Sequence, residues 1–143
     1  ILTVGSSTGK LRILISEEFK EFLRNPNISK LQLFNFAKQY YDAVADDTYL
    51  QKGYPRQAYA MSKLLINLYM RNYLSKQPEF VNKNVRVYAL CPGWCRTDMT
   101  GPRALLSAEE GAETPAYLMN LPWNIDKEFQ GKFFYDKKVT SLE

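Results

Sequence analysis

The chain has 143 residues, 45% of them hydrophobic, which is typical of one globular domain rather than a disordered segment. The net charge of +4 comes from scattered Lys and Arg residues, and the pair Lys137-Lys138 is too short for a nucleic-acid patch. Two cysteines without histidine exclude a four-ligand zinc site, and no apolar run approaches the roughly 20 residues of a membrane span. We therefore expect no metal, no nucleic acid, no membrane span, and free thiols in a reducing compartment such as the cytoplasm.

The N-terminal part of the sequence predicts a buried strand followed by two helices. Residues 1–4 are apolar and lead directly into the small-residue turn at residues 5–9. Ser16 is expected to start a first helix, which ends near Pro26, and Ser29 is the expected N-cap of a second. The expected apolar stripe of the second helix consists of Leu31, Phe34, Ala37, Tyr41 and Val44.

The remaining elements alternate between helix and strand. Residues 56 to about 75 have helical spacing, with Pro78 marking the exit from the helix. Residues 84–90 are nearly continuous in apolar character, as central parallel strands are. A capping box at residues 107–110 opens another helix, and residues 131–135 form a last short strand.

Three strands that alternate with helices predict an α/β fold with parallel strands, which we expect to lie side by side in chain order. Right-handed crossovers then place the helix at 56–75 on one face of the sheet and the helix after Ser107 on the other. A doubly wound sheet normally has two halves, and the first carries a Gly-rich phosphate-binding turn that these residues lack. The sequence thus predicts half of a Rossmann-type sheet, whose first strand needs an N-terminal half or a partner chain to cover its edge.

Tyr59 and Lys63 form the strongest local signal for chemistry. They lie four residues apart on a predicted helix, so both side chains share one face. An ammonium beside a phenol favours the phenolate, and such a pair can exchange a proton near neutral pH. The spacing alone is weak evidence, because it arises often by chance on surface helices. The strand-end turns at residues 5–9 and 92–99 strengthen it, since ligands of doubly wound sheets bind beyond the carboxyl ends of strands.

In this order, the Ser-Ser-x-x-Gly, Tyr-x-x-x-Lys and Pro-Gly patterns resemble those of the short-chain dehydrogenase/reductase family. The resemblance implies that Ser6 is the catalytic serine, with Gly5 in the place of the first Ser of the pattern. It implies that Tyr59 is the general acid/base and that Lys63 assists it and holds the nicotinamide ribose. The implied cofactor site consists of Tyr59, Lys63, Pro92, Gly93, Trp94, Cys95 and Thr97. Trp94 and Met99 are the implied walls of the substrate pocket, although core packing is an alternative for Met99.

Longer stretches narrow the resemblance to monomeric carbonyl reductases. These relatives share the long spacer between Ser6 and Tyr59, the run at residues 92–102 and the stretch at residues 107–115. The resemblance implies the C-terminal catalytic half of such a domain, residues 1–143, with insertion helices at about 16–50 and without the N-terminal dinucleotide-binding half. It also implies NADPH-dependent reduction of a small ketone or aldehyde, with NAD left open. The isolated chain is not expected to bind the cofactor with useful affinity, because the pyrophosphate site lies in the other half. The alternative is a non-catalytic, degenerate or split subunit of a larger assembly.

Overall fold

A computed structural model describes residues 1–122 and 127–143 of the chain. The helices are α1 (Glu17–Arg24), α2 (Lys30–Ala45), α3 (Ala58–Asn72), α4 (Pro78–Asn82) and α5 (Ala108–Met119). The strands are β1 (Leu2–Val4), β2 (Tyr88–Cys91), β3 (Phe133–Tyr135) and β4 (Lys138–Thr140). Short 3-10 turns lie at Leu11–Ile13, Leu74–Lys76 and Lys127–Phe129. Within the described ranges, no helix is both long and apolar enough to cross a bilayer.

The sheet has the strand order β1-β2-β3-β4. The pairs β1–β2 and β2–β3 are parallel, as expected, and β4 is antiparallel to β3. The expectation of three strands is therefore wrong by one. The β3–β4 turn contains Asp136 at φ 48° and Lys137 at φ 60°, two left-handed residues of the kind that tight hairpins require. Because Gly or Asn usually fills such positions, this turn gives little signal in the sequence.

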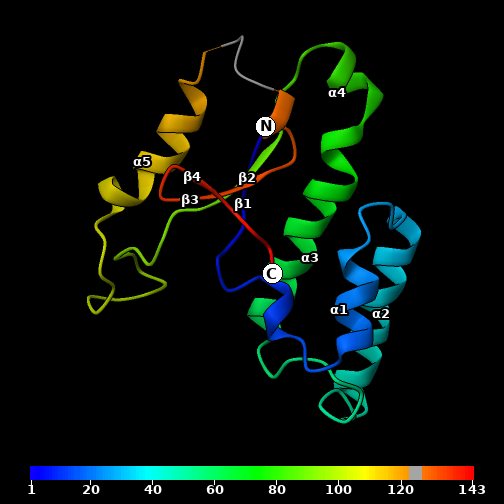
Figure 1. The fold of residues 1–143 in the computed structure, drawn as a ribbon. Coiled ribbons are helices and arrows are strands. Elements are labelled where there is room, and N and C mark those ends of the chain that lie inside the picture. Colours follow the sequence, from blue (N-terminus) through cyan, green and yellow to red (C-terminus); the bar gives the residue numbers. More distant parts are fainter. Residues whose placement is uncertain (123–126) are drawn as a thin grey trace.

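The two faces of the sheet carry different helices, as Figure 1 shows, with α3 on one side and α5 on the other. Successive side chains of a strand point to opposite faces. Ala89 and Cys91 accordingly join the core beneath α3, and Tyr88 and Leu90 join the core beneath α5 together with Phe134. Both faces of β2 are covered, which explains its nearly continuous apolar sequence. The expected placement of the two helices on opposite faces is confirmed.

The starts of α1, α2 and α5 were predictable from their capping residues. Ser16, Ser29 and Ser107 each accept a backbone hydrogen bond from the third residue of the helix that follows. At α2 and α5 the side chains of Gln32 and Glu110 return the bond to the backbone of the cap, which completes a capping box. These bonds satisfy N–H groups that have no partner inside the helix.

The apolar face of α2 differs from the expected stripe. Leu33, Phe36 and Ala43 are the buried residues of this helix. The Phe36 ring packs edge-on against Phe19 of α1, with centroids 5.1 Å apart, and against Tyr54 at 5.5 Å. Apolar residues occur on two faces of α2, and this aromatic cluster determines which face turns inward. Four members of the expected stripe are exposed instead: Leu31, Phe34, Tyr41 and Val44.

Two boundaries near β2 also differ from expectation. Pro78 does not simply end a helix but begins α4 at its first position, where its missing N–H costs nothing. The strand expected at residues 84–90 is shorter: Asn84 has a left-handed backbone with φ 53°, and the Val87 amide donates to the Gln130 side chain rather than to a neighbouring strand. Extended pairing with β1 begins only at Tyr88.

Candidate active site

The turns after β1 and β2 leave the sheet at the same edge. Val4 pairs with Leu90, so the two parallel strands end side by side. The Gly5 amide continues this pairing by donating to the Leu90 carbonyl at 2.8 Å. Just beyond, the Cys91 thiol lies 3.6 Å from the Ser7 hydroxyl and donates to it. The two turns are thus in direct contact, as the strand-end argument predicts.

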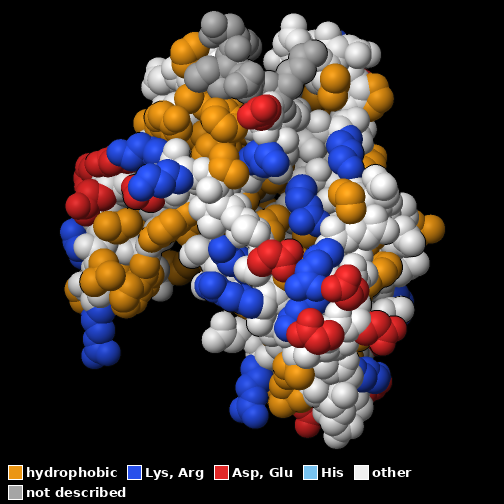
Figure 2. Space-filling view, in the orientation of Figure 1, with side chains coloured by type: hydrophobic (Ala, Val, Ile, Leu, Met, Phe, Trp, Pro, Cys, Tyr) orange, Lys and Arg blue, Asp and Glu red, His pale blue; other side chains and the backbone are white. Residues whose placement is uncertain are grey.

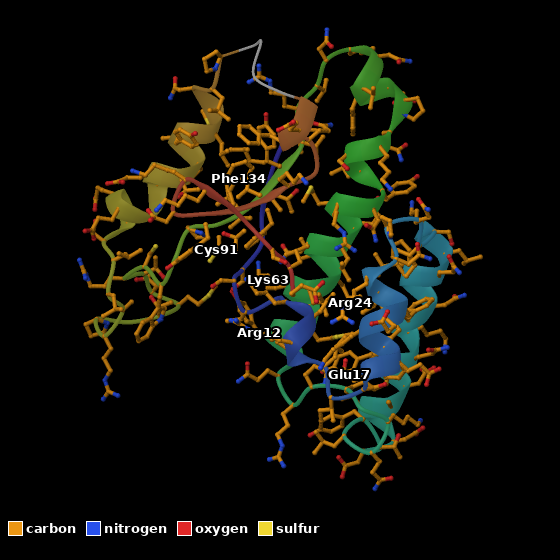
Figure 3. All side chains as sticks on the ribbon, viewed as in Figure 1. Arg12, Glu17, Arg24, Lys63, Cys91 and Phe134 are labelled. Atoms are coloured by element: carbon orange, nitrogen blue, oxygen red, sulfur yellow. The ribbon has the colours of Figure 1, made fainter. Side chains whose placement is uncertain are left out.

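Helix α3 closes the other side of the turn after β1. The Lys63 ammonium donates a hydrogen bond of 3.1 Å to the Val4 carbonyl, at the last residue of β1. Gly9 lies directly on the helix, since a Cβ at this position would be 2.5 Å from the Leu64 nitrogen. In Figure 3, Lys63 and Cys91 flank the segment that follows β1. Helix α3 therefore contacts the turn after β1, and that turn contacts the turn after β2.

The three expected catalytic residues differ in their surroundings. Ser6 is buried, and its hydroxyl lies 2.9 Å from the Thr8 hydroxyl and accepts from the Thr8 amide at 3.2 Å. Tyr59 is 53% exposed, and the Lys63 ammonium lies 5.7 Å from its ring centroid. Within residues 1–122 and 127–143, no hydrogen bond joins the Tyr59 hydroxyl to Ser6 or Lys63. We predict that the Ser6 and Tyr59 hydroxyls come within hydrogen-bond reach of each other, directly or through one water.

The loop after β2 has its own internal supports. The Arg96 amide donates to the Leu106 carbonyl at 2.8 Å, and the Leu106 amide donates to the Trp94 carbonyl at 3.1 Å. The Arg96 guanidinium also donates to the carbonyls of Ala104 and Leu105, at 3.1 and 2.9 Å. Arg96 therefore ties the two limbs of this loop together.

The base of this loop packs on the start of α5. The Cys95 thiol donates to the Pro92 carbonyl at 3.4 Å, and its sulfur occupies the space that a side chain at Gly111 would need. The Thr97 amide donates to the Thr100 hydroxyl at 3.1 Å, which leaves the exposed Thr97 side chain near the tip. The expected cofactor-binding residues of this loop therefore sit on a constrained backbone.

The tip of the loop exposes large apolar side chains. Trp94 is 52% exposed, Leu105 76% and Met99 85%, so core packing is the wrong interpretation for Met99. Figure 2 shows hydrophobic side chains gathered on this loop at the lower left and a hollowed surface between it and the segment after β1. This is the arrangement expected of residues that contact an apolar ligand.

Asn67 is a residue of the candidate site that the sequence reasoning missed. It lies four residues after Lys63 on α3 and is fully buried. Its side-chain nitrogen donates to the carbonyls of Ser6 and Gly9, at 3.3 and 2.9 Å. Its step of eight residues from Tyr59 on the same helix is the signal that could have found it. In the part of the chain that the structure describes, no His, Cys, Asp and Glu cluster could hold a metal.

The chain is similar to carbonyl reductases along most of its length. It is 36% identical over 137 residues to carbonyl reductase (NADPH) 1 of Rattus norvegicus, covering 94% of this chain and 49% of that protein. The human protein of the same name is 33% identical over 125 residues, covering 87% of this chain and 45% of that protein. Salutaridine reductase of Papaver somniferum superposes with a TM-score of 0.76 at 28% identity, over 95% of this chain and 44% of that one. No family model matches the chain.

The fold, the strand-end turns and these relatives define the class of protein. The chain belongs to the short-chain dehydrogenase/reductase family, and within it to the relatives of carbonyl reductase. It spans about half the length of the curated relatives that it matches.

Proposed function

We propose that this chain supplies the catalytic half of an NADPH-dependent carbonyl reductase that acts on a small ketone or aldehyde. The observation that carries the proposal is the position of Lys63. Its ammonium donates to the Val4 carbonyl at the end of β1 and lies 5.7 Å from the centroid of the Tyr59 ring. This position supports an acid/base pair at that edge of the sheet, because ligands of such folds bind there. The relatives whose names specify NADPH support this cofactor, and a cytoplasmic location is part of the proposal.

The residues divide the proposed reaction among themselves. The Tyr59 phenol gives a proton to the carbonyl oxygen as it becomes an alkoxide, and its exposure leaves it accessible to a substrate. The Ser6 hydroxyl donates a hydrogen bond to the same oxygen and orients it, exchanging its present partner Thr8 for the substrate. Trp94 and Met99 provide apolar walls that exclude water from the reacting carbonyl.

The nicotinamide end of the cofactor fits the donors at this edge. Lys63 has three protons on its ammonium and uses one for the Val4 carbonyl, which leaves two for ribose hydroxyls. Thr97 is exposed on the loop after β2, and in this proposal its hydroxyl exchanges its partner at 3.2 Å, the Thr100 hydroxyl, for the carboxamide. Gly93, at φ 89°, allows the backbone of that loop to turn closely around a flat ring. When bound, the cofactor supplies the hydride that reduces the carbonyl carbon.

The test compares Tyr59→Phe with Tyr41→Phe in the natural protein that contains this chain. Loss of the Tyr59 hydroxyl removes general acid catalysis, so NADPH-dependent turnover should fall by about 10²–10⁴-fold. Binding of NADPH should stay nearly unchanged, whereas Lys63→Ala should weaken both binding and turnover. Tyr41 is 73% exposed on α2, so its change to Phe should affect neither. Near-normal turnover of Tyr59→Phe would overturn the proposal.

An unpartnered apolar surface favours a second candidate, a non-catalytic subunit of a larger assembly. A groove of about 300 Å³ beside β1 is lined by Thr3, Phe34, Ile66 and Tyr69, among others. Strand β1 forms one end of the sheet in the part of the chain that is described, so its outer edge is open there. Native mass spectrometry together with a turnover assay separates the candidates. A stable hetero-assembly without NADPH-dependent turnover would favour the second, and an active protein would favour the first.

A further inference from the structure

The line of side chains that begins with Tyr59 and Lys63 has a third member, Asn67. The three lie four residues apart on α3, so they follow one another along the same face of the helix. Asn67 has no exposed surface and stands in an otherwise apolar stretch, between Ile66 and Leu68. A buried amide is costly unless it is hydrogen-bonded, so its contacts indicate why it is there.

Both amide protons of Asn67 serve the turn after β1. Its nitrogen donates to the Gly9 carbonyl at 2.9 Å and to the Ser6 carbonyl at 3.3 Å. The Gly9 amide in turn donates to the Ser6 carbonyl at 3.0 Å, which closes the turn. Asn67 therefore clamps the first and last residues of the segment that carries the Ser6 hydroxyl.

The absence of a side chain at Gly5 makes room for the Asn67 side chain. A Cβ at Gly5 would overlap the Asn67 side-chain oxygen and would lie 3.1 Å from its Cγ and 3.3 Å from the Phe133 ring. That oxygen is buried and has no hydrogen-bond partner within the described residues. The missing side chain at Gly5, where the family pattern has Ser, thus leaves the space that Asn67 occupies. Two observations, the clamp and the matching gap, point to the same contact.

We propose that Asn67 is a positioning residue that holds the Ser6 turn in its working geometry. The proposal rests on the proposed function, because it assigns Ser6 to the substrate oxygen. Asn67 acts only through Ser6: it fixes the two carbonyls that bracket the turn, and thereby the direction of the Ser6 hydroxyl. A misplacement of about 1 Å at a reacting group can cost about 10²-fold in rate.

The test uses Asn67→Asp, which keeps the shape of the side chain and removes the two N–H donors of the amide. Its matched control is Asn72→Asp, a buried residue of the same helix whose oxygen accepts from the Arg71 guanidinium and whose nitrogen has no partner in the described residues. In the natural protein, Asn67→Asp should lower kcat by about tenfold to 100-fold with little change in KM for NADPH. Asn72→Asp should change kcat by less than about twofold. If the Asn67→Asp variant fails to fold, Asn67→Ser, which also removes the amide group, takes its place with the same expectations.

A double substitution separates positioning from a general structural role. With Ser6→Ala in place, the Asn67 substitution should lower kcat no further, because the group that it orients is gone. An independent further loss of tenfold or more would overturn the proposal. Hydrogen exchange of the Gly9 amide should also accelerate by about tenfold or more in the Asn67 variant, while amides of α5 keep their rates. If the unaltered protein reduces no carbonyl, the proposed function fails, and this exchange measurement alone decides whether Asn67 holds the turn; an unchanged Gly9 rate would overturn it.

Discussion

Replacement of Gly9 by Ala tests whether the turn after β1 really rests on α3. The added Cβ would be 2.5 Å from the Leu64 nitrogen, about 1 Å closer than the roughly 3.5 Å at which non-bonded atoms attract. The obstacle is the backbone of a buried helix, which cannot turn aside as a side-chain tip can. Inserting a methyl into such a place costs about 1–3 kcal/mol. Lifting the turn to relieve the overlap also weakens the Asn67 bond to the Gly9 carbonyl, which contributes about 0.5–1.5 kcal/mol.

The expected loss for Gly9→Ala is therefore about 1.5–4.5 kcal/mol in the free energy of unfolding. Urea unfolding followed by circular dichroism measures it, provided that the slope with denaturant is unchanged. Gly101 gives the control, because a Cβ there meets nothing within 4 Å and the only penalty is its left-handed backbone at φ 70°. Asn tolerates that conformation, so Gly101→Asn should be mild, whereas Gly9→Asn should be as severe as Gly9→Ala. A Gly9→Ala loss below about 0.5 kcal/mol would refute the close packing of turn and helix.

Three further changes test the fold around the site. Burial raises the pKa of Tyr54 above its ordinary value near 10. Its contribution to stability is therefore complete below that pH and is lost as pH rises through the raised pKa. Tyr54→Phe should lessen the decline in urea stability above about pH 10, and the exposed Tyr41→Phe should not. Asp47 lies at φ 55° just after α2, where its amide and that of Thr48 donate to the last carbonyls of the helix. Asp47→Gly should therefore raise the free energy of unfolding by about 0.5–1 kcal/mol and increase Tm. A decrease would show that the left-handed backbone carries no strain. Ser107→Ala removes one side of the capping box of α5 and should cost about 1 kcal/mol in urea unfolding, and a neutral result would mean that the box is not formed in solution.

The sequence predicted those parts of the fold that depend on local chemistry. The three serine caps identify the starts of α1, α2 and α5 because a cap satisfies nearby N–H groups and needs no tertiary partner. The inward face of α2 was not predictable in this way. Both faces carry large apolar residues, and Phe36 rather than Phe34 is buried because Phe19 and Tyr54 come from elsewhere in the chain. Strand β4 was missed because it has three residues and follows a turn without glycine.

The candidate site, like the fold, has features that the sequence predicted and features that it did not. The pairing of Tyr59 with Lys63 and the position of Gly5 after β1 follow from spacing and order along the chain. The partners of Lys63 and Asn67 do not, because both are backbone carbonyls, which any residue provides. Contacts to backbone carry no signature in the sequence of the partner, so only the fold reveals them. For the same reason the sequence gives no sign of the role of Arg96, which donates to two carbonyls of its own loop.

Different interactions hold the two turns at the edge of the sheet, so we expect the two turns to contribute to function in different ways. The turn after β1 is held by side chains of α3, Lys63 and Asn67, so its geometry depends on the packing of a helix against the sheet. The loop after β2 is held chiefly by its own backbone bonds and by Arg96, so its geometry is largely internal. Substitutions of Lys63 or Asn67 should therefore affect the reacting oxygen, through Ser6. The second support instead sets the position of the apolar side chains at the loop tip, which the proposed function assigns to the substrate.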